Sequence, residues 1–189
     1  MGGDLSVDRL LIAYKHGIFP WYDGEIPLWW CPDPRFVLYP NELLVSKSMQ
    51  LLLRKRSFHF TINTAFKDVI NHCKKVPRKD QDGTWINTDV EKAYTDLHEL
   101  GFAHSAEVWL DKKLVGGLYG IKMGKVFFGE SMFSLVSNAS KYAFISFVEI
   151  LKAEGIELID CQIYTAHLES LGARMIQREE FINSLQQLI

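Results

Sequence analysis

Two polar side chains that could take part in catalysis, Asp160 and Gln162, stand at the end of an apolar segment near the C-terminus of this 189-residue chain. If residues 156–162 form a strand, its regular alternation places both side chains on one face, about 6.5–7 Å apart. A carboxylate and an amide at that spacing can reach the same substrate. A carboxylate at the end of an apolar strand can equally cap a helix or join a salt bridge. The pattern leaves both interpretations open.

Cysteine chemistry is disfavoured. Cys161 is a single thiol beside a carboxylate on an apolar segment, and His167 is not placed as its local base, so the thiol has no reason to ionise. With Cys31 and Cys73 it makes an odd number of cysteines without a CxxC pair. This spacing favours three reduced thiols over a disulfide framework or a zinc site. His104 is expected to be a strand-end histidine satisfied by hydrogen bonds.

The bulk composition predicts a globular, cytoplasmic protein. An apolar content of 48% suffices for a proper core. Asp4 and Asp8 stand near the N-terminus without a basic run before an apolar stretch, and no segment approaches the ~18 uninterrupted apolar residues of a membrane span. We therefore expect no membrane association.

The charge pattern allows local contacts with nucleic acid. A net charge of −2 argues against binding over the whole surface but leaves room for a basic patch. An ordinary solvated helix end is the alternative interpretation of such a patch. Two basic patches are present: Lys47 with Arg54, Lys55 and Arg56, and Lys74 with Lys75, Arg78 and Lys79.

Apolar periodicity and capping residues predict mixed secondary structure. A capping box of Thr88 and Glu91 is expected to open one helix, and Gly101 to end it. Residues 77–83 are expected to form a mobile loop. Helices are expected at about 7–16, 48–54, 65–74, 88–100 and 138–154, and from about 165 and 178; strands at about 59–62, 104–110, 114–121, 125–128 and 156–162.

The segment 18–40 contains five prolines and several large aromatic residues, so we expect an irregular, rigid surface loop. Large aromatic residues there could cover a flat ligand. Beyond it, the order of three strands, a helix, a strand and a helix indicates an α+β or α/β fold with a central mixed sheet, the order of GNAT-type acyltransferases. Gly116-Gly117 lies within a strand hairpin, so it does not read as a phosphate loop.

Eight short strings resemble the leucyl/phenylalanyl-tRNA–protein transferases, in the same order and over nearly the whole chain. Other members carry a further segment before the Gly-Gly-Asp and often a longer C-terminal tail, whereas here Met1 directly precedes Gly2. The strings are Gly2-Gly3-Asp4-Leu5-Ser6, Gly17-Ile18-Phe19-Pro20-Trp21, Leu28-Trp29-Trp30-Cys31-Pro32-Asp33-Pro34-Arg35, Gly83-Thr84-Trp85-Ile86, His104-Ser105-Ala106-Glu107-Val108-Trp109, Gly129-Glu130-Ser131-Met132-Phe133-Ser134, Asn138-Ala139-Ser140-Lys141 and Asp160-Cys161-Gln162.

The resemblance implies a small N-terminal domain packed on a GNAT-like acyltransferase domain, with residues 1–36 and 37–100 forming the first and residues 101–189 the second. It implies transfer of Leu, Phe or Met from aminoacyl-tRNA to proteins that begin with Arg or Lys, which marks them for degradation by the N-end rule. It also implies that the enzyme uses neither a metal nor an organic cofactor. We expect a monomer.

The resemblance assigns roles to individual residues. Trp21 and Trp85 would stack on the 3′ adenosine of the tRNA, a contact that suits an end common to all tRNAs. Gln162 would orient or relay the proton of the attacking amine, Asp160 would accept or anchor it, and Glu130 would help to bind the cationic acceptor. The aminoacyl pocket would be apolar and would comprise Leu118, Phe127, Met132, Phe147 and Ile159. The alternative interpretation is that these five are simply core residues.

Two other functions are weighed against this one. An acetyl-CoA-dependent acetyltransferase would share the fold order, but it needs an Arg/Gln-x-x-Gly-x-Gly/Ala turn at a helix start to cradle pyrophosphate. The helix expected at 138–154 opens with Ser-Asn-Ala-Ser instead. A non-catalytic protein that binds RNA or protein N-termini is the other alternative, and only a turnover assay separates it from an enzyme.

Overall fold

The computed structural model describes residues 2–22, 24–76 and 86–189. At its centre is a seven-stranded sheet of order β4-β5-β6-β7-β8-β3-β9, in which only β7 and β8 are parallel neighbours. The predicted α+β class with a central mixed sheet is confirmed. The strands are β1 (Phe19–Pro20), β2 (Trp29–Trp30), β3 (Arg35–Leu38), β4 (His59–Ile62), β5 (Ala103–Leu110), β6 (Lys113–Met123), β7 (Val126–Ser134), β8 (Leu158–Gln162) and β9 (Arg174–Ile176).

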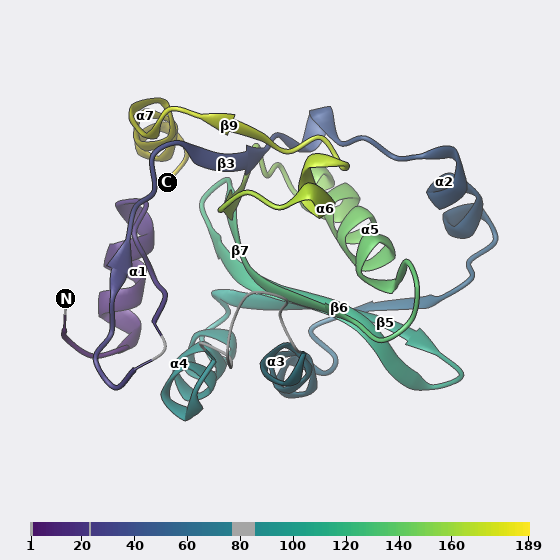
Figure 1. Ribbon diagram of the computed structural model, residues 1–189, viewed down its shortest axis with the longest axis horizontal. Coiled ribbons are helices and arrows are strands. Elements are labelled where there is room, and N and C mark those ends of the chain that lie inside the picture. Colours follow the sequence, from purple (N-terminus) through teal and green to yellow (C-terminus); the bar gives the residue numbers. More distant parts are fainter. Residues whose placement is uncertain (1, 23, 77–85) are drawn as a thin grey trace.

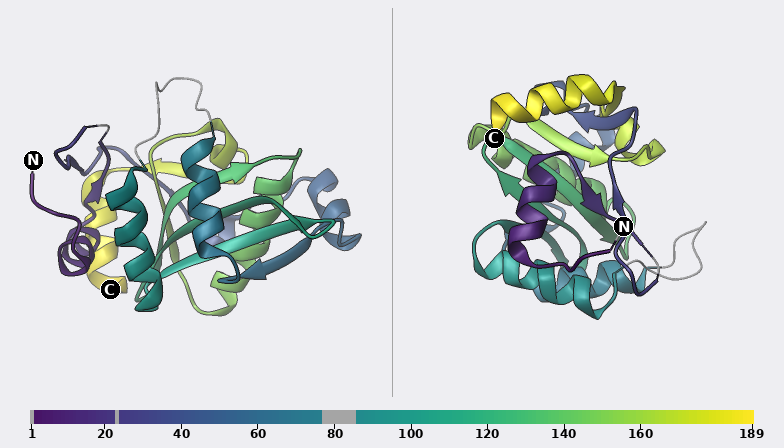
Figure 2. Two further views of the ribbon diagram at one scale, coloured as in Figure 1. Left: turned by 90° about the horizontal axis from the view of Figure 1, so that it is seen from below. Right: turned by 90° about the vertical axis from the view of Figure 1, so that its left-hand side faces the viewer.

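Helices cover both faces of this sheet. α5 lies on one face, and α3 and α4 lie on the other (Figure 1). The first and last helices, α1 and α7, lie at the same end of the molecule (Figure 2). The helices are α1 (Val7–Lys15), the short 3-10 helix η1 (Pro40–Glu42), α2 (Lys47–Arg54), α3 (Phe66–Lys75), α4 (Thr88–Glu99), α5 (Ala139–Ala153), α6 (Ala166–Glu169) and α7 (Arg178–Leu188).

The predicted apolar stripes form the core. α3 buries Phe66, Val69, Ile70 and Cys73 between the sheet and α4, as its periodicity indicated. α5 is buried along most of its length. Its close approach to the sheet explains Gly116, since a Cβ there would lie 2.6 Å from the Cβ of Ala139.

The prediction of an irregular segment at 18–40 was wrong at several places. Residues 19–20 and 29–30 pair as a short antiparallel ladder, β1 with β2. More importantly, all four residues of β3 are buried, and the strand lies between β8 and β9. A four-residue strand between prolines gives almost no periodic signal, so only its tertiary partners reveal it.

Two further boundaries and one short strand differ from the predictions. Asn87, not Thr88, caps α4, because its side chain accepts a hydrogen bond from the Val90 N–H at 2.9 Å. β7 continues to Ser134 instead of ending at Phe128. The three-residue strand β9 was not expected at all. The predicted loop at 77–83 lies outside the described residues.

The predicted domain division at residue 100 stays a prediction. The central sheet takes strands from both sides of that position: β3 and β4 come before it, and β5 to β9 after it. Among the described residues, no helix is both long enough and apolar enough to cross a membrane.

Candidate active site

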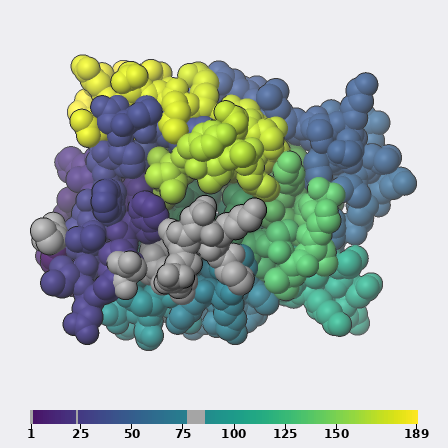
Figure 3. All heavy atoms as spheres, in the orientation of Figure 1, coloured from purple at the N-terminus to yellow at the C-terminus, as the bar shows by residue number. Residues whose placement is uncertain are grey.

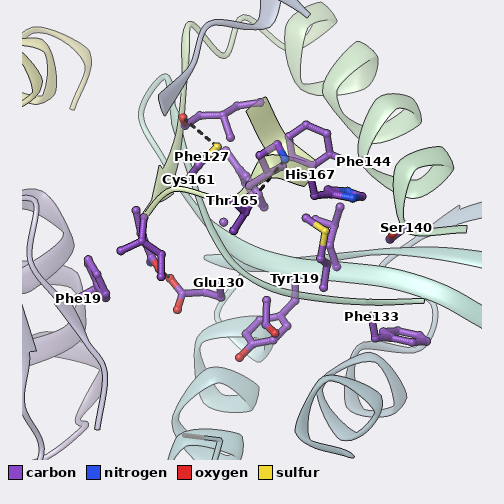
Figure 4. Close-up of a pocket in the computed structure, with 18 of the residues that line it drawn as sticks. Phe19, Tyr119, Phe127, Glu130, Phe133, Ser140, Phe144, Cys161, Thr165 and His167 are labelled. Atoms are coloured by element: carbon purple, nitrogen blue, oxygen red, sulfur yellow. Dashed lines mark hydrogen bonds between the residues drawn. The ribbon is translucent and has the colours of Figure 1, made fainter. Parts of the chain in front are cut away.

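A cavity of about 570 Å³ opens between β7 and β8. The two parallel strands pair only at three positions, the last of which joins Phe128 to Asp160. β7 then continues alone on this side, so side chains beyond that point line a space instead of a neighbouring strand. Figure 4 shows Phe19 and Glu130 on the side of the N-terminal segment, and Phe144 and Ser140 on the side of α5.

Glu130 reaches this cavity because of an irregularity in β7. On β6, Tyr119 pairs with Ser131 and the next residue, Gly120, pairs with Gly129. Glu130 is therefore the extra residue of a β-bulge and has no partner opposite it on β6. A bulge bends the strand and re-aims the side chain, which is why bulges recur beside active sites.

The carboxylate of Glu130 is held by three neutral donors. Its Oε1 accepts hydrogen bonds from the Tyr14 hydroxyl at 2.7 Å and from Gln162 Nε2 at 3.0 Å. Its Oε2 accepts one from the Tyr94 hydroxyl at 2.9 Å. The two tyrosine hydroxyls, which come from α1 and α4 and are fully buried, also contact each other. Helices from the first half of the chain thus orient a group on β7.

Burial raises the pKa of Glu130 from its ordinary value of 4.5 to about 7, although the hydrogen bonds from both tyrosines and Gln162 lower it. The negative charge of Asp160 also raises it. Burial likewise raises the pKa of Tyr14 and Tyr94, so both remain neutral donors. A carboxylate with a pKa near neutrality can exchange a proton with a substrate at physiological pH.

Asp160 lies behind the cavity and does not line it. Both of its oxygens accept hydrogen bonds from the buried guanidinium of Arg35, at 2.8 and 2.6 Å. Its Oδ1 also accepts the backbone N–H of Gln162 at 2.9 Å. The salt bridge that the sequence left open as one interpretation of Asp160 is therefore present.

Gln162 does line the cavity, although it does not share a face with Asp160 as regular alternation predicted. On β3, Phe36 pairs with Gln162 and Val37 pairs with Asp160, so Cys161 is an extra, bulged residue on β8. Gln162 itself has a left-handed backbone with φ of 65°. The prediction assumed an unbroken strand, and the strand is irregular at this point.

Four of the five residues expected to form the aminoacyl pocket line the cavity: Leu118, Phe127, Met132 and Ile159. Phe147 stands behind them, with its ring edge-on to that of Phe127 at a centroid distance of 5.1 Å. Its contact with the cavity is indirect, since it fixes the orientation of Phe127.

Of the two tryptophans expected at the tRNA end, Trp21 lines the cavity, and its ring lies edge-on to Trp30 at 6.1 Å. Trp85 lies outside the described residues. On the face drawn in Figure 3, the segment that follows β8 lies between the N-terminal segment and α5.

The two basic patches differ in how free their charges are. Lys47, Arg54, Lys55 and Arg56 are all exposed on α2 and just after it. In the other patch, Lys74 pairs with Glu91 at 3.2 Å on α3 and α4. Arg78 and Lys79 lie outside the described residues.

Two histidines also have a buried nitrogen. His104 is the second residue of β5, and its Nδ1 lies 3.0 Å from the side-chain amide nitrogen of Asn63. The expectation of a histidine satisfied by hydrogen bonds holds for this nitrogen only, since Nε2 has no hydrogen-bond partner within the described residues. His167 lines the cavity. Burial lowers the pKa of both rings, so they are neutral at physiological pH.

Cysteine and metal chemistry find no support in the described part of the chain. The three cysteines are free, as predicted. Burial and the charge of Asp160 raise the pKa of Cys161, which keeps it a thiol. Within residues 2–22, 24–76 and 86–189, no group of three His, Cys, Asp or Glu side chains is placed to hold a metal ion.

Sequence reasoning missed Tyr14, Tyr94 and Arg35. Tyr14 and Tyr94 lie on the buried faces of α1 and α4, where their aromatic rings fit the apolar pattern. Their hydroxyls were the available signal, since a buried tyrosine needs a hydrogen-bond partner. Arg35 offered only its place in a resembling string, because nothing in a pattern reveals a buried arginine whose partner is 125 residues away.

Together these groups suit acyl transfer to an amine. The apolar part of the cavity can hold a hydrocarbon side chain, and the carboxylate and amide at its edge can bind and deprotonate an ammonium group.

Comparison with known proteins defines the family. Residues 3–33 match the leucyl/phenylalanyl-tRNA protein transferase N-terminal domain, and residues 37–186 match leucyl/phenylalanyl-tRNA protein transferase. The protein of that name from Flavobacterium johnsoniae is 56% identical over 187 residues, which cover 98% of this chain and 88% of the relative. That from Syntrophus aciditrophicus is 57% identical over 182 residues, which cover 96% and 76%. The chain belongs to the leucyl/phenylalanyl-tRNA protein transferase family, as the resemblance predicted.

Solved structures with a similar arrangement are much more distant. One is a GCN5-related N-acetyltransferase-like protein from Streptococcus suis, 12% identical, with a TM-score of 0.44 over 90% of this chain and 64% of that one. Another is L-PGS from Bacillus licheniformis, 11% identical, with a TM-score of 0.47 over 86% and 55%. Nothing about activity follows from likenesses at this distance.

Proposed function

We propose that the cavity between β7 and β8 is where this enzyme transfers leucine or phenylalanine from charged tRNA to the N-terminal Arg or Lys of an acceptor protein. One observation carries the assignment to this cavity. Glu130, with a pKa of about 7, and Gln162 are hydrogen-bonded to each other at the edge of an apolar space large enough for an amino-acid side chain.

The apolar end of the cavity binds the side chain of the donor. Leu118, Phe127, Met132 and Ile159 offer no buried polar group, which suits Leu and Phe and excludes charged side chains. The flexible thioether of Met132 allows the pocket to adapt to Met as well. Trp21, at the N-terminal side of the same cavity, offers its ring to the terminal adenine.

The acceptor amine binds at Glu130 and Gln162. Glu130 accepts a proton from the α-ammonium group, whose ordinary pKa of about 7.7–8.0 lies close to that of the carboxylate. The neutral amine attacks the ester carbonyl, so that a C–N bond forms and the C–O bond to the ribose breaks. The nitrogen loses a second proton, and this proton passes to the ribose oxygen as it leaves, while the first proton remains on Glu130. The products are an amide and a free 3′ end.

Gln162 and Asp160 serve this step differently. The side-chain oxygen of Gln162 can accept a hydrogen bond from the amine while its nitrogen donates to Glu130. Asp160, enclosed by Arg35, holds the backbone of Gln162 instead of touching substrate. Glu130, the carboxylate expected to bind the cationic acceptor, lines the cavity, whereas Asp160 does not.

The test is a transfer assay with Leu-tRNA or Phe-tRNA and peptides that begin with Arg, Lys, Ala or Glu, followed by mass spectrometry. We expect products only from the Arg and Lys peptides. Equal rates on all four would contradict the proposed acceptor site. Binding of tRNA without any product would favour the non-catalytic alternative.

A second assay tests the donor end. Trp21→Ala should raise KM for charged tRNA and leave the rate at saturating donor close to wild type, since base stacking contributes about 1–3 kcal/mol to binding. Unchanged KM would make Trp21 a packing residue. Cytoplasmic location, action as a monomer and the marking of products for degradation accompany this proposal as predictions.

A further inference from the structure

Arg35 is a fully buried arginine at the first position of β3. Its Nε and Nη2 donate to the two oxygens of Asp160, so that guanidinium and carboxylate meet edge to edge. This two-bond geometry fixes the plane of the carboxylate as well as its position. The ion pair is sealed inside the protein, and neither side chain is exposed.

Two phenylalanines from opposite ends of the chain hold the guanidinium in place. The Arg35 Cζ lies 4.8 Å from the ring centre of Phe19 on β1 and 4.6 Å from that of Phe181 on α7. Both distances lie within the range of cation–π attraction. The orientation of Arg35 therefore depends on the N-terminal segment and on the C-terminal helix together.

Asp160 in turn holds the backbone of Gln162 in place. The Oδ1 atom that receives Arg35 Nε also receives the Gln162 backbone N–H at 2.9 Å. Gln162 has a left-handed backbone, which is uncommon for a residue with a side chain, and the hydrogen bond to Asp160 holds its N–H in this conformation. From that backbone its Nε2 reaches Glu130 Oε1 at 3.0 Å.

We propose that Arg35 is a positioning residue for the transfer reaction: it fixes Asp160, and through Asp160 it holds Gln162 in the backbone conformation that brings the side-chain amide to Glu130. The inference rests on the proposed function. Arg35 itself does not line the cavity and has no contact with substrate in this scheme.

Stability alone is a poor account of this ion pair. A buried ion pair contributes little net stability compared with apolar side chains of the same volume, because both charges lose their hydration. What apolar side chains could not supply is a planar, two-bond contact to a carboxylate that must also hold a backbone N–H. A lysine keeps the charge but loses that geometry.

The first variant is therefore Arg35→Lys, measured in single-turnover transfer of Phe from saturating Phe-tRNA to an Arg-initiated peptide. We expect the rate to fall about tenfold or more, since small displacements of positioned groups have effects of this size. KM for Phe-tRNA should stay within about twofold of wild type, because the donor pocket is untouched.

The pH dependence of the same rate separates positioning from a structural role. The hydrogen bond from Gln162 lowers the pKa of Glu130, so its loss should raise that pKa further. The ascending limb of the pH–rate profile should consequently move to higher pH in Arg35→Lys. A merely structural role for Arg35 leaves the limb where it is.

A pair of α7 variants keeps the test decisive if Arg35→Lys does not fold. Phe181→Leu removes one of the two rings against Arg35 but retains an apolar side chain. Leu185→Ala, one turn further along the buried face of α7, is the control for loss of packing. We expect Phe181→Leu to slow transfer about threefold and to move the ascending limb of the pH–rate profile to higher pH. Leu185→Ala should change neither the rate nor the limb at temperatures below its melting temperature.

A double variant tests whether Arg35 acts through Asp160. If it does, Arg35→Lys/Asp160→Asn should be no slower than the slower single variant, whereas independent roles would multiply the two effects. If both Arg35→Lys and Phe181→Leu transfer at the wild-type rate, with the ascending limb of the pH–rate profile unchanged, the inference is overturned. Failure of the proposed function is a separate result, because then the wild-type enzyme itself yields no product.

Discussion

Two glutamates on the central sheet, Glu107 and Glu130, are both hydrogen-bonded carboxylates, but only Glu130 lines the cavity proposed to hold the substrate. Glu107 on β5 is completely buried and accepts hydrogen bonds from Thr61, from Ser105 and from the backbone N–H of Ala65 at the start of α3. Glu130 on β7 is also hydrogen-bonded on both oxygens, but part of it faces a cavity.

The partners of the two carboxylates explain the difference. Those of Glu107 lie on β4, β5 and the residue that precedes α3, so its bonds join neighbouring segments of one layer. Those of Glu130 lie on α1, α4 and β8, three segments that are distant in sequence, and their arrangement leaves one side open to substrate. The partners of Glu107 enclose it, so it links neighbouring segments, whereas the partners of Glu130 leave one side of the carboxylate accessible from the cavity.

The largest effect should follow from Glu130→Gln. The amide cannot accept the proton of the incoming amine, so kcat should fall about 10²-fold or more, the usual range for loss of a general base. KM for charged tRNA should change little. Glu107→Gln is the matched control, and its transfer rate per folded molecule should equal that of the wild type. Equal losses in both variants would erase the distinction between the two sites.

The reverse ranking is expected for stability. Glu107→Gln turns an acceptor of three hydrogen bonds into a group with one donor end, which leaves a buried hydroxyl or N–H poorly matched. The free energy of unfolding should fall by about 1–3 kcal/mol, as measured in urea. A wild-type denaturation midpoint would show that Glu107 does not join β4 to β5.

Glu130 should instead give stability a pH dependence. Its pKa in the folded protein, about 7, lies above the ordinary value of 4.5, so folding favours the protonated form. This contribution is complete below about pH 4.5 and is lost as pH rises through 7. The wild type should therefore lose about 3 kcal/mol of stability relative to Glu130→Gln over that range. Urea unfolding at several pH values measures it, and parallel curves would show an unshifted pKa.

The smallest change should come from removing one hydroxyl beside Glu130. Tyr94→Phe deletes a donor to Oε2, so the pKa of Glu130 should rise and the ascending limb of the pH–rate profile should move to higher pH. The maximal rate should drop only a few-fold, because Tyr14 and Gln162 still orient the carboxylate. Tyr39, which packs against Arg174 outside the cavity, provides the control: Tyr39→Phe should leave the ascending limb in place.

Sequence reasoning succeeded for regular elements and failed at irregular ones. Periodicity identified α3, β4 and α5, because burial of a repeating face is a local property. It failed where a residue was inserted into a ladder. The bulges at Glu130 and Cys161 cannot be read from alternation, and they decide which side chains line the cavity.

Long-range pairing was the other limit. The resemblance supplied the identities of Glu130, Asp160 and Gln162 as site residues, but it could not say that Asp160 is enclosed by Arg35 while Gln162 faces the cavity. Both facts depend on β3 lying beside β8, and that neighbourhood has no local signal in a chain where the two strands are more than a hundred residues apart.

The place of β3 also has a consequence for how the molecule is made. This strand leaves the ribosome early, yet its neighbours in the sheet, β8 and β9, are the last two strands to be synthesised. Contacts of such large sequence separation have a high loop-closure entropy and slow the folding of a domain. Until α7 has emerged, Arg35 lacks Phe181, and a nascent chain cannot assemble its site. The enzyme is therefore expected to remain inactive until α7 has been synthesised and has packed against Arg35.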